Sequence, residues 1–183
     1  ALQSSGMMQT SGELTAAKNV KATADGAMTV SGAVTADDSV NITSANGTMI
    51  VDGDVSATNG DIELQSKEAM QTSGALTANQ NVNITSTDGA MTVSGDVSTT
   101  TGDITLQSSG TMQTTGELTA AKNVKATADG TMTIGGDVYA STGDIALKSK
   151  KEMKTTGELT ANQNVNITST DGTMIVDGDV SAT

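Results

Sequence analysis

A glycine returns at nearly the same interval along the whole chain of 183 residues. Successive glycines lie 20 or 21 residues apart, at Gly12, Gly32, Gly53, Gly74, Gly95, Gly116, Gly136, Gly157 and Gly178. A methionine keeps the same interval from Met8 to Met174. Self-similarity at a period of about 20–50 residues is the sequence signature of solenoids and other repeat architectures. The repeat therefore constrains the fold more than any other feature.

Within each unit, apolar residues alternate with polar ones in three short runs. In residues 75–95 the runs contain Leu76, then Val82 and Ile84, then Met91 and Val93. This alternation predicts short strands, and the spacing typical of an amphipathic helix is absent. Clusters of Asn, Asp and Gly between the runs predict turns, in which we expect glycine or asparagine to supply positive φ angles.

Three strands and three turns in 20–21 residues predict one coil of a parallel β-helix. The fold class is then all-β, a solenoid of about nine coils stacked at about 4.8 Å into a rod near 43 Å long. Antiparallel hairpins explain the pattern less well, because they do not require a methionine at one fixed phase. Four columns of residues should face inward: one from Leu14 to Val180, one from Met8 to Met174, one from Val20 to Val165, and one containing Val30, Val51, Val93, Ile134 and Val176, with Thr72, Thr114 and Thr155 at other levels.

The composition agrees with a narrow interior. Hydrophobic residues make up 35% of the chain and aromatic residues 1%, and proline is absent. Such composition with a net charge of −12 is typical of disorder. The regular order of the residues argues instead for a thin core that methionine fills flexibly, and proline would remove a hydrogen-bond donor from the ladder.

The same numbers exclude several classes of function. A net charge of −12 argues against binding to nucleic acid or anionic membranes, and no apolar run has the length of a membrane-spanning helix. The chain has no His, Cys or Arg, so it lacks the usual general base, thiolate ligands and bidentate phosphate clamps. We expect no enzyme and no cofactor. Pectate-lyase-like enzymes share the fold class, but they need a basic catalytic residue in a loop-built cleft.

A longer repeat of two coils overlies the first. From residue 54 onward, units with the pattern GDI-L-S alternate with units with the pattern N-V-I-T. We expect residues 1–183 to form a single β-helix segment, a fragment of a longer filament. Neither end carries a polar cap, and open strand edges invite pairing. The natural object is therefore expected to be longer, or the rods to stack end to end.

The runs GELTAAKNVKATADGAMTVSG at 12–32 and GALTANQNVNITSTDG at 74–89 resemble filamentous haemagglutinin repeats. These form the shafts of large bacterial exoproteins exported by two-partner secretion, which include adhesins and contact-dependent growth-inhibition toxins. The resemblance covers the whole chain and implies a right-handed parallel β-helix, a secreted or cell-surface location, and service as a long spacer. Family repeats are near 19–20 residues, so the turns here should be slightly longer.

We therefore expect the chain to be the structural shaft of a secreted adhesin or toxin-delivery filament, acting as a rigid spacer. The alternative is a self-assembling extracellular fibre or matrix subunit joined through the open ends of the β-helix. The expected partners are other segments of the same filament, including end-to-end contacts between copies. The sequence does not identify a receptor.

A column of acidic residues follows the glycines and supplies the candidate metal ligands. Five consecutive coils carry one each, namely Asp96, Glu117, Asp137, Glu158 and Asp179. Hard oxygen ligands suit Ca²⁺. Carboxylates stacked at about 4.8 Å repel one another by roughly 0.9 kcal/mol per pair even in water. A solvated acidic edge without metal is the favoured interpretation.

Two further polar groups are interpreted as structural. The column Asn19, Asn81, Asn123 and Asn164 is predicted to be a turn ladder of stacked amides rather than a recognition surface. The basic cluster Lys148, Lys150, Lys151 and Lys154, with Lys67, Glu68 and Glu152 nearby, is predicted to be a mixed-charge face rather than a glycan or partner patch. An ice-binding face would need a regular Thr-x-Thr array, which Gln65, Gln107 and Lys148 interrupt.

Overall fold

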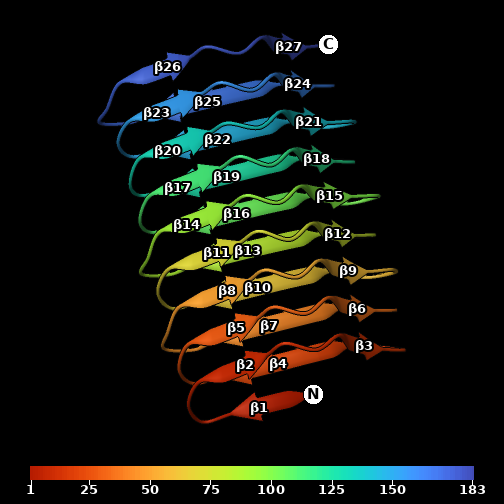
Figure 1. The fold of residues 1–183 in the computed structure, drawn as a ribbon. Helices are drawn as coiled ribbons and strands as arrows, with labels where there is room; N and C mark the ends of the chain where they lie inside the picture. Colours follow the sequence, from red (N-terminus) through yellow and green to blue (C-terminus); the bar gives the residue numbers. More distant parts are fainter.

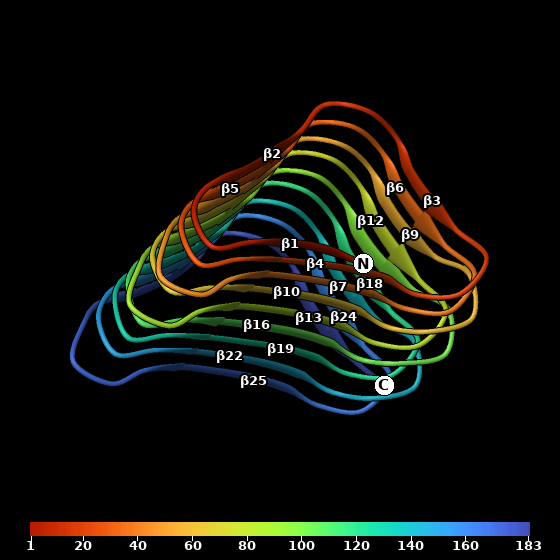
Figure 2. The ribbon, with the colours of Figure 1, turned by 90° about the horizontal axis from the view of Figure 1, so that it is seen from below.

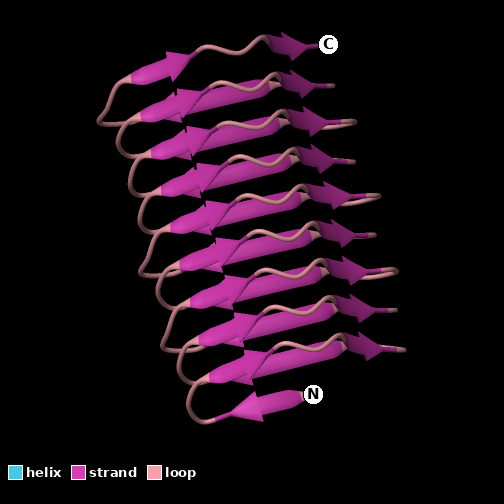
Figure 3. Cartoon of the chain, in the orientation of Figure 1, coloured by secondary structure: helices cyan, strands magenta, loops and turns pink.

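The computed structural model describes residues 1–183 and contains 27 strands and no helix. The strands form three parallel sheets of nine strands, which we name A, B and C (Figures 1 and 3). Each coil contributes one strand to each sheet, so the predicted all-β parallel solenoid with three strands per coil is confirmed. The two ends of the chain lie at opposite ends of the stack (Figure 1).

The strands of sheet A are the longest, with five residues in all but the first. They are β1 (Leu2–Ser4), β4 (Val20–Ala24), β7 (Val40–Ser44), β10 (Ile62–Ser66), β13 (Val82–Ser86), β16 (Ile104–Ser108), β19 (Val124–Ala128), β22 (Ile145–Ser149) and β25 (Val165–Ser169).

The strands of sheets B and C have three residues each. Sheet B consists of β2 (Met8–Thr10), β5 (Met28–Val30), β8 (Met49–Val51), β11 (Met70–Thr72), β14 (Met91–Val93), β17 (Met112–Thr114), β20 (Met132–Ile134), β23 (Met153–Thr155) and β26 (Met174–Val176). Sheet C consists of β3 (Leu14–Ala16), β6 (Val34–Ala36), β9 (Val55–Ala57), β12 (Leu76–Ala78), β15 (Val97–Thr99), β18 (Leu118–Ala120), β21 (Val138–Ala140), β24 (Leu159–Ala161) and β27 (Val180–Ala182).

The four predicted inward columns are confirmed, because residues of each column pair with one another from coil to coil. Met70, for example, pairs with Met49 on one side and Met91 on the other. Thr72 lies between Val51 and Val93 and has no exposed surface. Seen along the axis, the coils enclose one narrow interior (Figure 2). A single cluster of 40 buried hydrophobic residues fills it from Val20 to Ala161.

The structure adds inward columns that the sequence analysis missed. In sheet A, the middle of each strand carries Ala22, Ile42, Leu64, Ile84, Leu106, Ala126 and Leu147, all buried. The last position of these strands is mostly serine and also buried. In sheet C, the last position is alanine in every coil except one, where Thr99 replaces it. Small side chains therefore line the two narrow angles where sheet A meets its neighbours.

The lengths of the three corners explain why the repeat varies between 20 and 21 residues. The corner from sheet B to sheet C always has three residues, such as Asp52–Asp54 between β8 and β9. The corners from C to A and from A to B have either three or four. A coil of 21 residues has one four-residue corner, and a coil of 20 has none. The extra turn length thus lies on either side of sheet A.

The expectation that glycine or asparagine supplies positive φ angles is wrong. No residue in the chain has a positive φ. The glycines at the B–C corner are required for a steric reason instead. They stack directly on one another, and this leaves no room for a side chain. A Cβ added to Gly95 would lie 2.1 Å from the carbonyl oxygen of Gly74 in the preceding coil. The neighbouring coil, rather than the local backbone conformation, excludes a side chain here.

Candidate functional surfaces

The five acidic candidates occupy the last position of the B–C corner, immediately before sheet C. The Asp carboxylates accept a backbone hydrogen bond from the next coil: Glu117 N–H donates to Asp96 Oδ1 and Glu158 N–H to Asp137 Oδ1, each at 2.8 Å. Asp54 accepts from the N–H of Ala75 in the same way. Asp54, Asp96 and Asp137 therefore each help to join two coils, whereas Asp179 lies in the last coil.

The glutamates of this column bond along their own coil. The hydroxyl of Thr160 donates to Glu158 Oε1 at 2.8 Å, and Thr119 donates to Glu117 Oε1. Aspartate and glutamate alternate from Asp96 to Asp179. Consecutive carboxylates are thus directed to different partners, and the chain contains no group of three or more acidic side chains placed to hold a metal ion. The solvated acidic edge without metal stays a prediction.

A second polar column lies at the C–A corner, at the residue before each strand of sheet A. Asn19, Asn81, Asn123 and Asn164 belong to it, as predicted, but they do not stack on one another. The levels between them hold Ser39, Asp61, Asp103 and Asp144, which the sequence analysis did not place in the column. The predicted ladder of stacked amides is therefore a ladder in which amides alternate mainly with carboxylates.

The bonds of this ladder repeat from coil to coil. Asn123 donates both its backbone N–H and its side-chain amide to Asp103 Oδ1, at 2.9 and 2.8 Å. Its own Oδ1 accepts the backbone N–H of Asp144 at 2.8 Å. Asn81 and Asn164 repeat the double donation to Asp61 and Asp144. The signal in the sequence was the residue before each sheet A strand from β10 onward, Asp before Ile and Asn before Val.

These columns run without interruption through the central coils, where the family comparison also falls. Residues 89–173 match the Haemagglutinin repeat family. The matched range spans strands β14 to β25, and segments outside it copy segments inside it: residues 76–88 recur unchanged at 159–171. The match and the solenoid together fit a filamentous haemagglutinin-like repeat shaft. No curated protein and no solved structure gave a significant match to the chain.

Haemagglutinin repeats are structural, and proteins that carry them are generally secreted or exposed at the cell surface. The chain offers the surface of a rod rather than a cleft. Its depressions are open, and they follow the sheet faces, as between Asp103, Asn123 and Asp144 on the side of sheet A. No helix long and apolar enough to cross a membrane is present.

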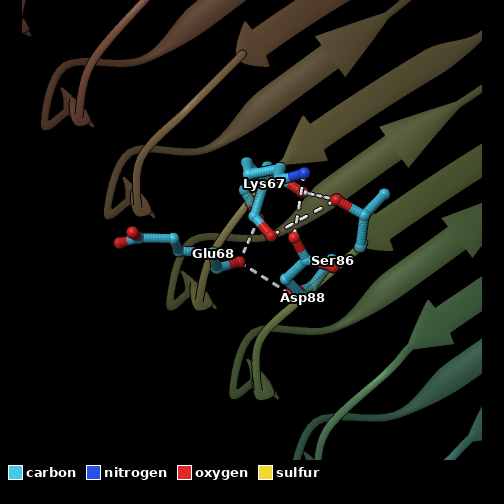
Figure 4. A network of polar contacts seen from close by, with 6 residues as sticks. Lys67, Glu68, Ser86 and Asp88 are labelled. Atoms are coloured by element: carbon cyan, nitrogen blue, oxygen red, sulfur yellow. Dashed lines mark hydrogen bonds and ion pairs between the residues drawn. The ribbon is translucent and has the colours of Figure 1, made fainter.

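At the A–B corner, the buried serine column forms hydrogen bonds with the backbone of the solenoid. Ser66 and Ser86 lie in adjacent coils, and both donate their hydroxyl to the carbonyl oxygen of Glu68, at 2.8 and 2.7 Å. Figure 4 shows Ser86 and Glu68. On the surface of the same corner, Lys67 Nζ and Asp88 Oδ2 form an ion pair at 2.9 Å (Figure 4). The serine hydroxyls thus supply donors to turn carbonyls that would otherwise have no hydrogen-bond partner in the interior.

The basic cluster is a mixed-charge surface, as predicted, although Lys67 and Glu68 do not lie near it. They follow β10, which is four strands from β22 in sheet A, about 19 Å away at the usual strand spacing. Within the cluster, Lys150 pairs with Asp129 at 2.9 Å and Lys154 with Asp177 at 3.9 Å. All these side chains are about half exposed, so each pair contributes little to stability.

The outer face of sheet C carries a hydroxyl group in every coil, which the sequence analysis also missed. The nine residues are Thr15, Thr35, Ser56, Thr77, Ser98, Thr119, Tyr139, Thr160 and Ser181. The column of outward-facing residues beside these hydroxyls is the acidic column that contains Asp96 and Glu117. This face therefore has no second row of threonines. Tyr139, the only aromatic residue, is 46% exposed between Thr119 and Thr160.

Proposed function

We propose that this chain is a segment of the rigid shaft of a secreted or cell-surface bacterial filament, which holds an adhesive or toxic module away from the cell. Export by two-partner secretion is part of the proposal. The observation that supports it best is the unbroken register of the three sheets, each with nine strands in chain order. A spacer needs length and stiffness, and this architecture provides both.

The stiffness has its origin in the backbone bonds between coils. The chain has 123 backbone–backbone hydrogen bonds, and 60 of them lie outside the strands themselves. Some of these 60 join equivalent corner residues of adjacent coils, such as Gly130 N–H to the carbonyl of Gly110 at 2.9 Å. Strands and corners are both bonded along the axis, so the rod has no hinge between coils.

The length of such a shaft follows from the number of coils. Each coil contacts mainly its two neighbours, so stability is close to a sum over coils and coil interfaces. The two-coil alternation makes a pair of coils the natural unit of length. Adding or removing one pair changes the length of the shaft by about 10 Å. Each coil still stacks on a coil of the other type, so no new kind of interface between coils is created.

Deletion of residues 62–103 tests this proposal. The deletion removes two coils and joins Asp61 to Ile104, so that β16 stacks on β7 as β10 did. We expect a folded rod whose maximum dimension, measured by small-angle X-ray scattering at low protein concentration, falls by about 10 Å. An unfolded or flexible product would contradict a modular rigid shaft.

Deletion of residues 62–81 is the matched control, because it removes a single coil. It would bring Asp103 directly over Asp61, and Asp96 over Asp54. We expect this variant to fold with a clearly lower unfolding midpoint.

A separate test addresses the role of the chain: a spacer without a binding module should not agglutinate erythrocytes when it is displayed on beads. Agglutination by the isolated chain would replace the spacer role with direct adhesion.

A further inference from the structure

Two asparagines in the interior coils are each followed by a glycine, at Asn46–Gly47 and Asn59–Gly60. The first pair lies in the four-residue A–B corner between β7 and β8, and the second in the four-residue C–A corner between β9 and β10. Both asparagines are exposed, and both glycines are buried. Because glycine has no side chain to shield its backbone nitrogen, each pair places an electrophilic amide beside an accessible nucleophile.

Stacking of the coils requires the glycine in the A–B corner but not the asparagine. A Cβ added to Gly47 would lie 2.5 Å from the backbone nitrogen of Ala27 in the preceding coil. The residue before the glycine varies between coils, and Asn46 is the only amide at this position. The other A–B corners with a glycine have Ser5, Asp25, Asp88, Ser109, Asp129 and Asp171 there. The fold therefore tolerates an aspartate at position 46.

The backbone nitrogen of Gly47 is free to react. In two of the three-residue A–B corners the glycine nitrogen is held by the preceding coil: Gly26 N–H donates to the carbonyl of Gly6, and Gly130 N–H to the carbonyl of Gly110, both at 2.9 Å. In the four-residue corner 45–48, the N–H of Gly47 donates to no acceptor in the chain. The nucleophile is thus unbonded in the corner that contains Asn46.

Hydrogen bonds hold the second asparagine but not the first. The backbone N–H of Asn59 donates to the carbonyl of Asp37 at 2.8 Å, and the carbonyl of Asn59 accepts the side-chain amide of Gln80 at 3.0 Å. Neither the backbone nor the side chain of Asn46 forms a hydrogen bond within the chain. Ring closure between an asparagine side chain and the following nitrogen requires the asparagine backbone to rotate. Asn46 can rotate without breaking a bond, whereas Asn59 must break two.

We propose that Asn46 is a site of spontaneous deamidation in the folded chain. The Gly47 nitrogen attacks Cγ of Asn46, so that an N–Cγ bond forms and the Cγ–Nδ2 bond breaks. Nδ2 leaves as ammonia with the proton of the Gly47 N–H, and the product is a cyclic succinimide. One water molecule then opens the ring. Opening at Cγ leaves aspartate at position 46, and opening at the backbone carbonyl leaves isoaspartate. Water is the co-reactant, and nothing is oxidised or reduced.

The two products should affect the corner differently. Aspartate reproduces the residue that Asp88 and Asp171 supply in the other four-residue A–B corners, so the coil should stack as before with one more negative charge. Isoaspartate inserts an extra carbon into the main chain of the corner. The N–H of Glu68 in the next coil donates to the carbonyl of Gly47 at 3.1 Å, and the longer main chain should displace this acceptor. The inference does not depend on the spacer role.

Peptide mapping of the intact chain tests the proposal. Lys21 and Lys67 are consecutive lysines, so trypsin releases residues 22–67, which contain both Asn46 and Asn59. The folded chain is incubated at mildly alkaline pH, and fragmentation in a mass spectrometer then locates the conversion of amide to acid. We expect Asn59 to convert roughly tenfold more slowly than Asn46, because its two hydrogen bonds must open first. In denaturant, where neither asparagine is held, the two rates should be similar.

Asn46→Ser is the matched control, because Ser109 precedes Gly110 at the equivalent position. This variant should release ammonia only at the slow rate of Asn59. Equal rates at the two asparagines of the folded chain would overturn the proposal, as would an Asn46 that converts in denaturant only. Asn46→Asp supplies one product directly and should leave the thermal unfolding midpoint unchanged. A midpoint lowered as far as in an aged sample rich in isoaspartate would contradict the expected difference between the products.

Discussion

Two corners of the same coil solve the problem of stacking in different ways. The B–C corner has three residues in every coil, with a glycine at its centre. The C–A corner has three or four residues and ends on the alternating polar ladder. Steric exclusion by the adjacent coil restricts the centre of the B–C corner to glycine. The last position of the C–A corner accepts several residue types, because Asn, Asp and Ser can all form the hydrogen bonds of the ladder.

The difference explains the two periods in the sequence. Steric exclusion at the B–C corner is the same for every coil, so the glycine recurs with each coil. Donor and acceptor matching at the C–A corner relates one coil to the next: Asn donates its amide to Asp, and Asp can only accept. Two aspartates on adjacent levels would have no side-chain donor between them, so Asp and Asn alternate over two coils.

The largest effect is expected from a side chain at the B–C corner. In Gly95→Ala, the new Cβ would lie 2.1 Å from the Gly74 carbonyl oxygen and 2.8 Å from that of Ser73, both backbone atoms. Two coils would have to separate, and we expect a loss of about 3 kcal/mol or more in unfolding free energy, measured by chemical denaturation. Gly12→Ala is the control, because Gly12 has no atom within 4 Å of its Cβ position. An equal loss in both variants would refute the steric explanation.

Breaking the alternation at the C–A corner should have a smaller effect. In Asn81→Asp, a carboxylate oxygen replaces the amide that donates to Asp61 at 2.9 Å, and charges then lie on three consecutive levels. The lost donor and the repulsion should lower the unfolding free energy by about 1–3 kcal/mol, and salt should restore part of it. Asn19→Asp is the matched control, because the next level is Ser39 rather than a carboxylate. A loss that salt does not reduce would argue against repulsion.

Replacing a buried hydroxyl beside the B–C corner should stabilise the protein slightly. Thr72 is fully buried, and its Oγ1 has no hydrogen-bond partner. Thr72→Val keeps the shape, matches Val51 and Val93 on either side, and should raise the unfolding free energy by about 1 kcal/mol. Thr92→Val, on the outer face of the next coil, should change it by less than about 0.5 kcal/mol. Destabilisation by Thr72→Val would indicate a hydroxyl bond that the structure does not show.

Most of the fold was predictable because it depends on period and alternation, which a single sequence displays directly. The residues of the column from Leu14 to Val180 recur at one fixed position of the repeat. In a solenoid, residues at the same position of successive repeats stack into a column. The polar partners were harder to predict, since each lies one coil away in a residue of a different type. Residue type places Asn123 in one predicted ladder with Asn81 and Asn164, although its hydrogen-bond partners are Asp103 and Asp144.

The glycine error has a related cause. A glycine in a predicted turn usually indicates a positive φ, which is a property of its own backbone. Gly95 is required by the carbonyl of Gly74, twenty-one residues earlier in the chain. The sequence displays the recurrence of the glycine, but the reason for it is a contact between coils, which appears only once the coils are stacked.

The smallest effect is expected from calcium at the acidic edge of the B–C corner. The candidate ligands are Asp96, Glu117, Asp137, Glu158 and Asp179. Asp96 and Asp137 already accept backbone hydrogen bonds, and Glu117 and Glu158 accept threonine hydroxyls. A Ca²⁺ ion needs six to eight oxygen ligands around one point, whereas this column supplies one residue per coil along a line. The thermal unfolding midpoint should therefore be the same in Ca²⁺ and in EDTA. A midpoint that rises with Ca²⁺ and no longer does so in Asp137→Asn would show that the edge binds the ion, and the glutamates would then have to leave their threonines to do it.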